Sequence, residues 1–103
     1  MVLISVMYPG GENATFDTAY YVERHIALVK ERWGTMGLDG VQLVKAVATP
    51  DGSAPPFAVI ALLTFRSLEA FQSAAQAHAA EIFADIPKFT NVKPVVQINA
   101  PLA

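Results

Sequence analysis

His25 is the residue of this chain whose type and position most directly suggest chemistry. It lies in the stretch YYVERHIALV (residues 20–29), where Val22, Ile26 and Val29 form an apolar stripe at helical spacing. Because His25 falls within that stripe, its imidazole is expected between the helix and the core. A buried neutral imidazole has a lowered pKa and can act as a general base near neutral pH. The alternative is a core histidine whose two ring nitrogens bind backbone groups or tyrosine hydroxyls.

Four aromatic residues are candidates for binding a ligand beside His25. Tyr20, Tyr21 and Trp33 lie on the same predicted helix, and Phe89 follows the second predicted helix. Large rings between a helix and a sheet suit a pocket for a flat or apolar small molecule, and they equally suit an ordinary core. In the functional interpretation Tyr21 is a hydrogen-bond partner, and Trp33 and Phe89 are walls of the pocket.

Other kinds of site find little support in the sequence. His78 and Glu81 bring two potential metal ligands to one helical face, but no third ligand is marked unless His25 joins them across the helix pair. The chain has no cysteine, so thiolate catalysis and disulfides are excluded. It also has no G-x-G-x-x-G or G-x-S-x-G motif. We therefore predict neither a metal nor a cofactor, and a structural or surface role for His78.

The elements that must position these residues follow from hydrophobic patterning and turn signals. Asp17 is a predicted N-cap of the first helix, with Phe16 and Tyr21 at the hydrophobic staple positions, and Ser67 caps the second helix. Strands are expected at residues 2–8, 40–49, 57–65 and 91–98, and helices at 17–33 and 68–86. The order β-α-β-β-α-β predicts a ferredoxin-like α+β fold, one domain over residues 1–103. Its four-stranded antiparallel sheet would carry both helices on one face.

The third strand is apolar on both of its faces, which indicates how the domain assembles. Residues 57, 59, 61, 63 and 65 point one way and Ala58, Ile60 and Leu62 the other. Two helices on one face leave the second face uncovered. The charged fraction is also low, at 16% against about a quarter in typical domains. We predict a homodimer, a dimeric α+β barrel with its sheets face to face; the alternative is a monomer with a shallow apolar patch.

Charge and hydropathy exclude two classes of partner. Seven basic and nine acidic residues are scattered singly and give a net charge of −2, so nucleic-acid binding is not expected. The apolar start, MVLISVMY, lacks a basic region and ends in a YPGG turn, unlike a signal peptide. No segment reaches the roughly 20 apolar residues that span a bilayer. We expect a cytoplasmic protein with no membrane segment.

Two long stretches of the chain resemble the EthD family, named for ethyl tert-butyl ether degradation. They are YPGGENATFDTAYYVERHIALVKERWG (residues 8–34) and SLEAFQSAAQAHAAEIFADIPKFTNVKPVVQI (residues 67–98). The resemblance implies the dimeric α+β barrel, in a superfamily that includes cofactor-free monooxygenases, polyketide cyclases, lactone isomerases and haem-degrading enzymes. It places the family's helix histidine on His25 and its paired tyrosines on Tyr20 and Tyr21. The C-terminal motif falls on Asp85, Pro87, Phe89, Thr90, Asn91 and Pro94.

One departure from the family pattern lies directly after the histidine. The family often has Met-Pro-Leu where this chain has Ile26-Ala27-Leu28. Because a proline there would kink the helix, its absence predicts a straighter helix at His25.

Three functional hypotheses follow. The first is a small catabolic protein that holds a hydrophobic molecule beneath the first helix and performs cofactor-independent acid/base, oxygenase or isomerase-type chemistry with His25 as the catalytic group. The second is a non-catalytic accessory module that sequesters a ligand or serves a partner oxygenase. The third is haem handling through His25.

Overall fold

The computed structural model covers residues 1–103 and has the predicted element order. The strands are β1 (Val2–Pro9), β2 (Leu38–Lys45), β3 (Phe57–Phe65) and β4 (Val95–Asn99). The helical elements are α1 (Thr18–Tyr20), η1 (Tyr21–His25), α2 (Ile26–Trp33), α3 (Leu68–Ala84) and η2 (Ile86–Lys88). α1, η1 and α2 follow one another without a break and together form the predicted first helix.

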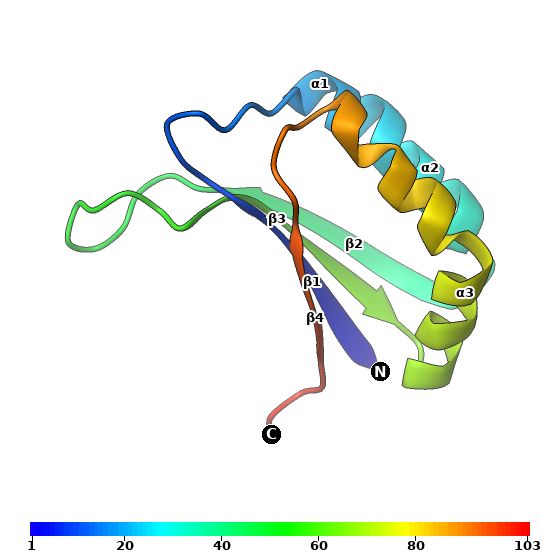
Figure 1. Cartoon of the computed structure of the whole chain (residues 1–103). Coiled ribbons are helices and arrows are strands. Elements are labelled where there is room, and N and C mark those ends of the chain that lie inside the picture. Colours follow the sequence, from blue (N-terminus) through cyan, green and yellow to red (C-terminus); the bar gives the residue numbers. More distant parts are fainter.

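The four strands form one antiparallel sheet in the order β2-β3-β1-β4, and the helices lie on one face of it (Figure 1). This is the predicted ferredoxin-like α+β arrangement. β4 is an edge strand and begins only after Pro94, since proline has no N–H to donate to a neighbouring strand. The expectation that residues 91–94 belong to this strand is therefore wrong.

Both predicted helix caps are present. The Asp17 side chain accepts a hydrogen bond from the backbone N–H of Tyr20, and the Ser67 side chain accepts one from the N–H of Ala70. Phe16 and Tyr21 form the expected staple, with their ring centroids 4.9 Å apart. These contacts fix where each helix begins and so the direction in which each leaves the sheet.

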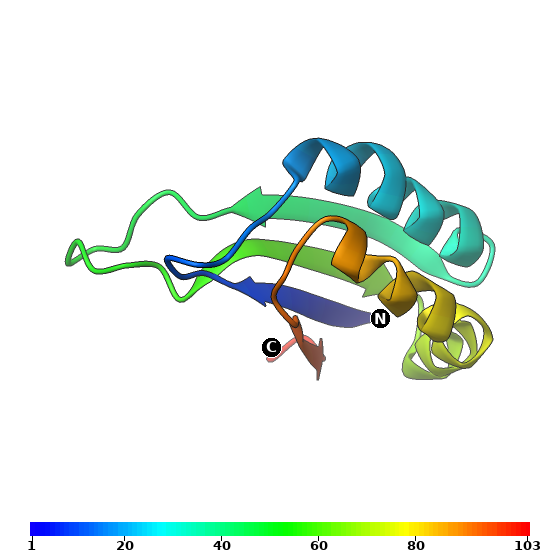
Figure 2. The same cartoon turned by 45° about the horizontal axis from the view of Figure 1, so that its top comes forward.

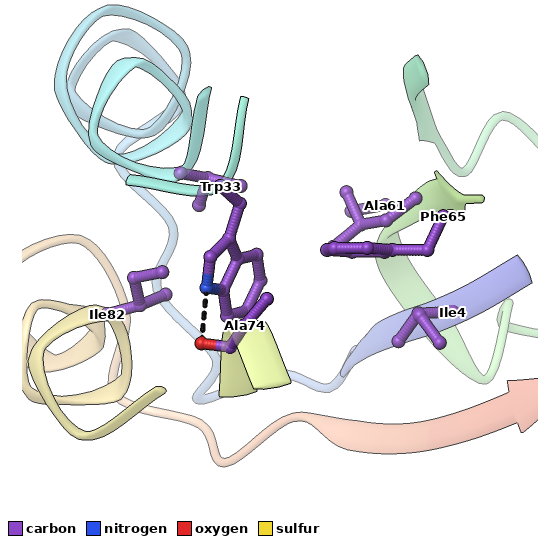
Figure 3. Close-up of a cluster of buried hydrophobic side chains, with 8 residues drawn as sticks. Ile4, Trp33, Ala61, Phe65, Ala74 and Ile82 are labelled. Carbon is purple, nitrogen blue, oxygen red and sulfur yellow. Dashed lines mark hydrogen bonds between the residues drawn. The ribbon is translucent and has the colours of Figure 1, made fainter. Parts of the chain in front are cut away.

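Trp33 is at the centre of the larger core cluster, between α3 and the sheet. Figure 3 shows its indole between Ile82 and Ala74 on one side and the β1 and β3 side chains on the other. The indole Nε1 donates a 2.8 Å hydrogen bond to the carbonyl oxygen of Ala74 (Figure 3). Leu68, the first residue of α3, is 38% exposed. Ala74 is fully buried, and its small side chain lets the indole approach the α3 backbone.

The second face of the sheet is not covered by any other element of the chain (Figure 2). Ala61, Leu63 and Phe65 of β3 are buried beneath the helices, as the alternation predicts. Ala58, Ile60 and Leu62 point to the opposite face and are half-buried by their neighbours in the sheet. The structure thus leaves an apolar sheet face open. None of the helices has the length and hydropathy that a membrane-crossing helix needs.

Candidate functional site

A π-helical turn, η1, carries both Tyr21 and His25 at the place where the first helix passes over the sheet. The backbone N–H of Ile26 donates to the carbonyl of Tyr21, five residues earlier. Such turns are rare and are found frequently at functional sites. The wider turn brings Tyr21, His25 and Ile26 together onto the buried side.

This turn bears on two expectations for the first helix. Val22, expected on the buried stripe, is 49% exposed, because the added residue per turn rotates it outward. The absence of a proline at residue 27 predicted a straighter helix; the structure shows in addition a π turn that ends at His25, which the sequence did not indicate. The wider π turn of the backbone, rather than a proline kink, sets the orientation of His25.

His25 is held by Asp85 at the end of α3. The side chain of His25 is 4% exposed, and its Nδ1 lies 3.0 Å from Oδ2 of Asp85, sixty residues away in sequence. The imidazole also packs on Phe89, with ring centroids 4.7 Å apart, and stacks nearly parallel to Tyr21. The ring is therefore held by two aromatic neighbours, which also contact each other, and by one nitrogen.

Asp85 accepts more than one hydrogen bond. The Tyr20 hydroxyl donates to its Oδ1 at 2.8 Å, and the Lys88 ammonium lies 3.5 Å from the same oxygen. Burial works to raise the pKa of Asp85, but the hydrogen bonds from Tyr20 and His25, with the nearby positive charge, outweigh it and hold that pKa below its usual value. Asp85 is thus ionised near neutral pH and acts only as an acceptor.

The protonation state of His25 follows from these surroundings. Burial lowers its pKa, and the hydrogen bond to Asp85 offsets this only in part. The imidazole is therefore neutral near pH 7. Because the Asp85 carboxylate requires a donor, the single proton lies on Nδ1, and Nε2 carries a free lone pair. No hydrogen bond within the structure uses Nε2, so His25 has the form of a general base.

His25 and Tyr21 line a small pocket between the helices and the sheet. The pocket has a volume of about 40 Å³, and His25 is the one lining residue that is neither apolar nor a tyrosine. Tyr21 is fully buried, and its hydroxyl makes no hydrogen bond of good geometry, although the Tyr8 hydroxyl lies beside it and lowers the pKa of Tyr21 against the larger effect of burial. Burial raises the pKa of Tyr21, so this hydroxyl remains protonated and available as a donor. Donor and base thus line the same apolar pocket.

The remaining candidate residues lie in different places. Trp33 lines the pocket, as expected of a wall residue. Tyr20 and Phe89 do not line it: Tyr20 binds Asp85 from outside, and Phe89 packs against the imidazole. His78 is part of a surface network in which its Nδ1 lies 3.9 Å from Glu81, which also binds Arg32. Nowhere do three or more histidine, aspartate or glutamate side chains gather as metal ligands.

Two features of the site were not predicted from the sequence. Asp85 was recognised only as part of a family motif, and its role as the partner of His25 depends on a contact between distant elements. Tyr8, from β1, lines the pocket and packs edge-on against Tyr21. Its only signal in the sequence is a tyrosine at the end of an apolar strand. Asp85 had a somewhat clearer signal, because it is an acidic residue within the otherwise apolar segment IFADIP (residues 82–87).

Comparison with known proteins agrees with this fold. The model of the EthD domain matches residues 9–93. An EthD-like protein from Ralstonia eutropha JMP134 has a TM-score of 0.89 and 37% identity, over 99% of this chain and 92% of its own. An ethyl tert-butyl ether degradation (EthD) family protein from Bacillus halodurans C-125 has a TM-score of 0.77 and 20% identity, over 99% of both chains.

A more distant structure shares the fold alone. A dimeric ferredoxin-like protein from an uncultured marine organism has a TM-score of 0.59 and 14% identity, over 100% of this chain and 96% of its own. No protein among the curated sequences matches the chain. The family model and the Ralstonia structure together cover nearly all of the sequence, and the chain therefore belongs to the EthD domain family.

Proposed function

We propose that this protein binds a small, largely apolar molecule between the helices and the sheet, with one oxygen function of that molecule entering the pocket beneath η1, where Tyr21 and His25 recognise it. The observation that carries the proposal is an apolar pocket lined by His25 and by the buried Tyr21, whose hydroxyl makes no hydrogen bond of good geometry even with Tyr8 beside it. A buried hydroxyl without a partner costs about 1–3 kcal/mol. A ligand oxygen that accepts from Tyr21 would remove this cost and so gain affinity.

His25 gives the pocket the means for acid/base chemistry. Its Nε2 can accept a proton from a bound hydroxyl or an activated C–H, while the Asp85 carboxylate stabilises the imidazolium that results. Tyr21 can donate to the oxygen on which negative charge develops. These groups support cofactor-independent proton transfer, with His25 as the catalytic base, within the oxidative or catabolic metabolism that the family resemblance implies.

A non-catalytic accessory module is the second candidate, and the size of the pocket favours it. A volume of about 40 Å³ leaves little room for a second reactant beside the ligand. In this case the same residues bind a molecule and release it unchanged to a partner enzyme.

Binding and turnover can be separated by one set of experiments. Protein purified without added ligand is examined by native mass spectrometry, and it is then titrated with a panel of phenols, ketones and lactones. We expect saturable binding that is weakened at least tenfold by Tyr21→Phe and is unchanged by Glu23→Gln, on the exposed side of η1. Product formation that His25→Gln abolishes supports the enzyme, and binding without product supports the module. Binding that is indifferent to Tyr21 would contradict both.

We also propose that two copies of the chain pair through the open face of the sheet, in the cytoplasm. The apolar, half-buried Ala58, Ile60 and Leu62 support this pairing, because an apolar sheet face open to water is unfavourable. A dimeric relative of the same fold is consistent with it. Light scattering should give twice the 11.0 kDa chain mass, and Ile60→Lys should give monomers, whereas Ala80→Lys on the outer side of α3 should not. A monomeric wild-type protein would refute the pairing.

A further inference from the structure

A second, wholly apolar cavity lies directly beside the pocket of Tyr21 and His25. It is a groove of about 290 Å³ between α3 and the β1–β4 edge of the sheet, and all nine residues that line it are hydrophobic. Ala75 and Ala79 of α3 and Val96 of β4 belong to the groove and not to the pocket. The helices leave this side of β4 uncovered, and Val96 is 41% exposed.

The groove and the pocket share part of their walls. Four residues line both cavities: Val6, Trp33, Leu63 and Phe83. Trp33 is held in place by its hydrogen bond to Ala74, so it forms a fixed wall. Phe83 is 44% exposed and also borders a surface hollow formed with residues 86–94. A rotation of Phe83 would therefore open both cavities to solvent at one point.

Because the two cavities differ in size, they can hold different parts of a ligand. A cavity of about 150 Å³ holds one benzene ring. The pocket, at about 40 Å³, can take only a small polar group, whereas the groove, at about 290 Å³, can take an apolar body larger than benzene. No lysine or arginine lines either cavity, and the Asp85 carboxylate lies next to the pocket, so a negatively charged group would be disfavoured there.

From this arrangement we infer that the ligand is an elongated, uncharged molecule with one terminal alcohol or carbonyl group. The oxygen lies in the pocket against Tyr21 and His25, and the apolar body extends past Trp33 into the groove between α3 and β4. The inference rests on the proposed function for the oxygen end, and it adds the apolar end and the exclusion of carboxylates.

A series of unbranched primary alcohols tests the inference. The dissociation constants of 1-propanol, 1-butanol, 1-hexanol and 1-octanol are measured with the full chain by NMR titration, together with octanoate. Affinity should rise about fourfold for each added methylene, which corresponds to about 0.8 kcal/mol per buried CH₂. Octanoate should bind at least tenfold more weakly than 1-octanol.

Two variants locate the apolar body. Ala79→Leu and Val96→Trp each fill the groove from a different element, and each should remove the gain of 1-octanol over 1-propanol while 1-propanol binding stays the same. Ala80→Leu, on the exposed side of α3, is the matched control and should bind like the wild type. Because Val96 is on the edge strand and partly exposed, its variant tests the groove even if Ala79→Leu does not fold.

The outcomes separate the inference from the function on which it rests. If 1-propanol binds in a Tyr21-dependent way but chain length has no effect, the inference is overturned and the proposed function stands. A chain-length gain that persists in both groove variants places the body elsewhere and also overturns the inference. If no alcohol binds in a Tyr21-dependent way, both fail.

Discussion

Nδ1 of His25 lies 3.0 Å from Oδ2 of Asp85, and this contact joins the π turn of the first helix to the end of the second. It fixes the proton of the imidazole on the nitrogen that faces Asp85. The other nitrogen, Nε2, has no hydrogen-bond partner within the protein and is therefore the one free to accept from a ligand. The ability of His25 to act as a base depends on this contact.

Replacing Asp85 by asparagine should shift two pKa values in the same direction. The pKa of Tyr20 is raised chiefly by its hydrogen bond to the carboxylate, so it should fall towards its usual value in Asp85→Asn. The pKa of His25 should fall further below 6.5, because the charge that opposes the effect of burial is lost. NMR titration of both side chains measures the shifts. Glu23→Gln, on the exposed side of η1, is the control, and a rise in the His25 pKa of Asp85→Asn would contradict the network.

The free energy of unfolding should decrease as the pH falls below about 6.5. The unfolded chain binds a proton at His25 near that pH, whereas the folded chain, with its lowered pKa, does not, so acid favours unfolding. A further decrease is expected at and below pH 3.8, where the depressed pKa of Asp85 has the same effect. Urea unfolding at pH 7.5 and 5.5 measures the first decrease. His25→Gln should lose less stability than the wild type over this interval, and an equal loss would remove His25 as its source.

Tyr21→Phe should be as stable as the wild type or more stable, by up to about 1 kcal/mol, while it binds ligand poorly. The substitution removes a buried hydroxyl that makes no hydrogen bond of good geometry, so the folded protein loses at most a weak contact with Tyr8. Tyr20→Phe is the comparison, because it removes the hydrogen bond to Asp85 and should lower the stability. Thermal or urea unfolding of the ligand-free proteins measures both changes. Marked destabilisation of Tyr21→Phe would show that the hydroxyl serves the fold rather than a ligand.

Much of the fold could be predicted because its signals are local. The alternation of Ala61, Leu63 and Phe65 with Ile60 and Leu62 identifies the two faces of β3, and the structure confirms it. Asp17 and Ser67 mark the helix starts, since a cap is a contact between residues three apart. Helical periodicity placed His25 beneath the helix, where it lies.

The rest of the site depends on contacts that no local pattern encodes. The π turn shifts the helical register by one residue, so Val22 lies outside although regular periodicity placed it inside. The pairing of His25 with Asp85 joins residues sixty positions apart, and it arises only when α3 packs beside the first helix. The state of the Tyr21 hydroxyl is likewise a property of the folded structure, because it depends on how Tyr8 from β1 lies beside it.

The tautomer of His25 is the most direct test of the account as a whole. In ¹⁵N-labelled protein at pH 7, two-dimensional NMR distinguishes a protonated from an unprotonated ring nitrogen by its chemical shift. We predict a neutral ring with Nδ1 protonated and Nε2 bare, and a change in the Nε2 shift when an alcohol binds. An imidazolium, or a neutral ring with its proton on Nε2, would contradict the assignment of His25 as the base that faces the pocket.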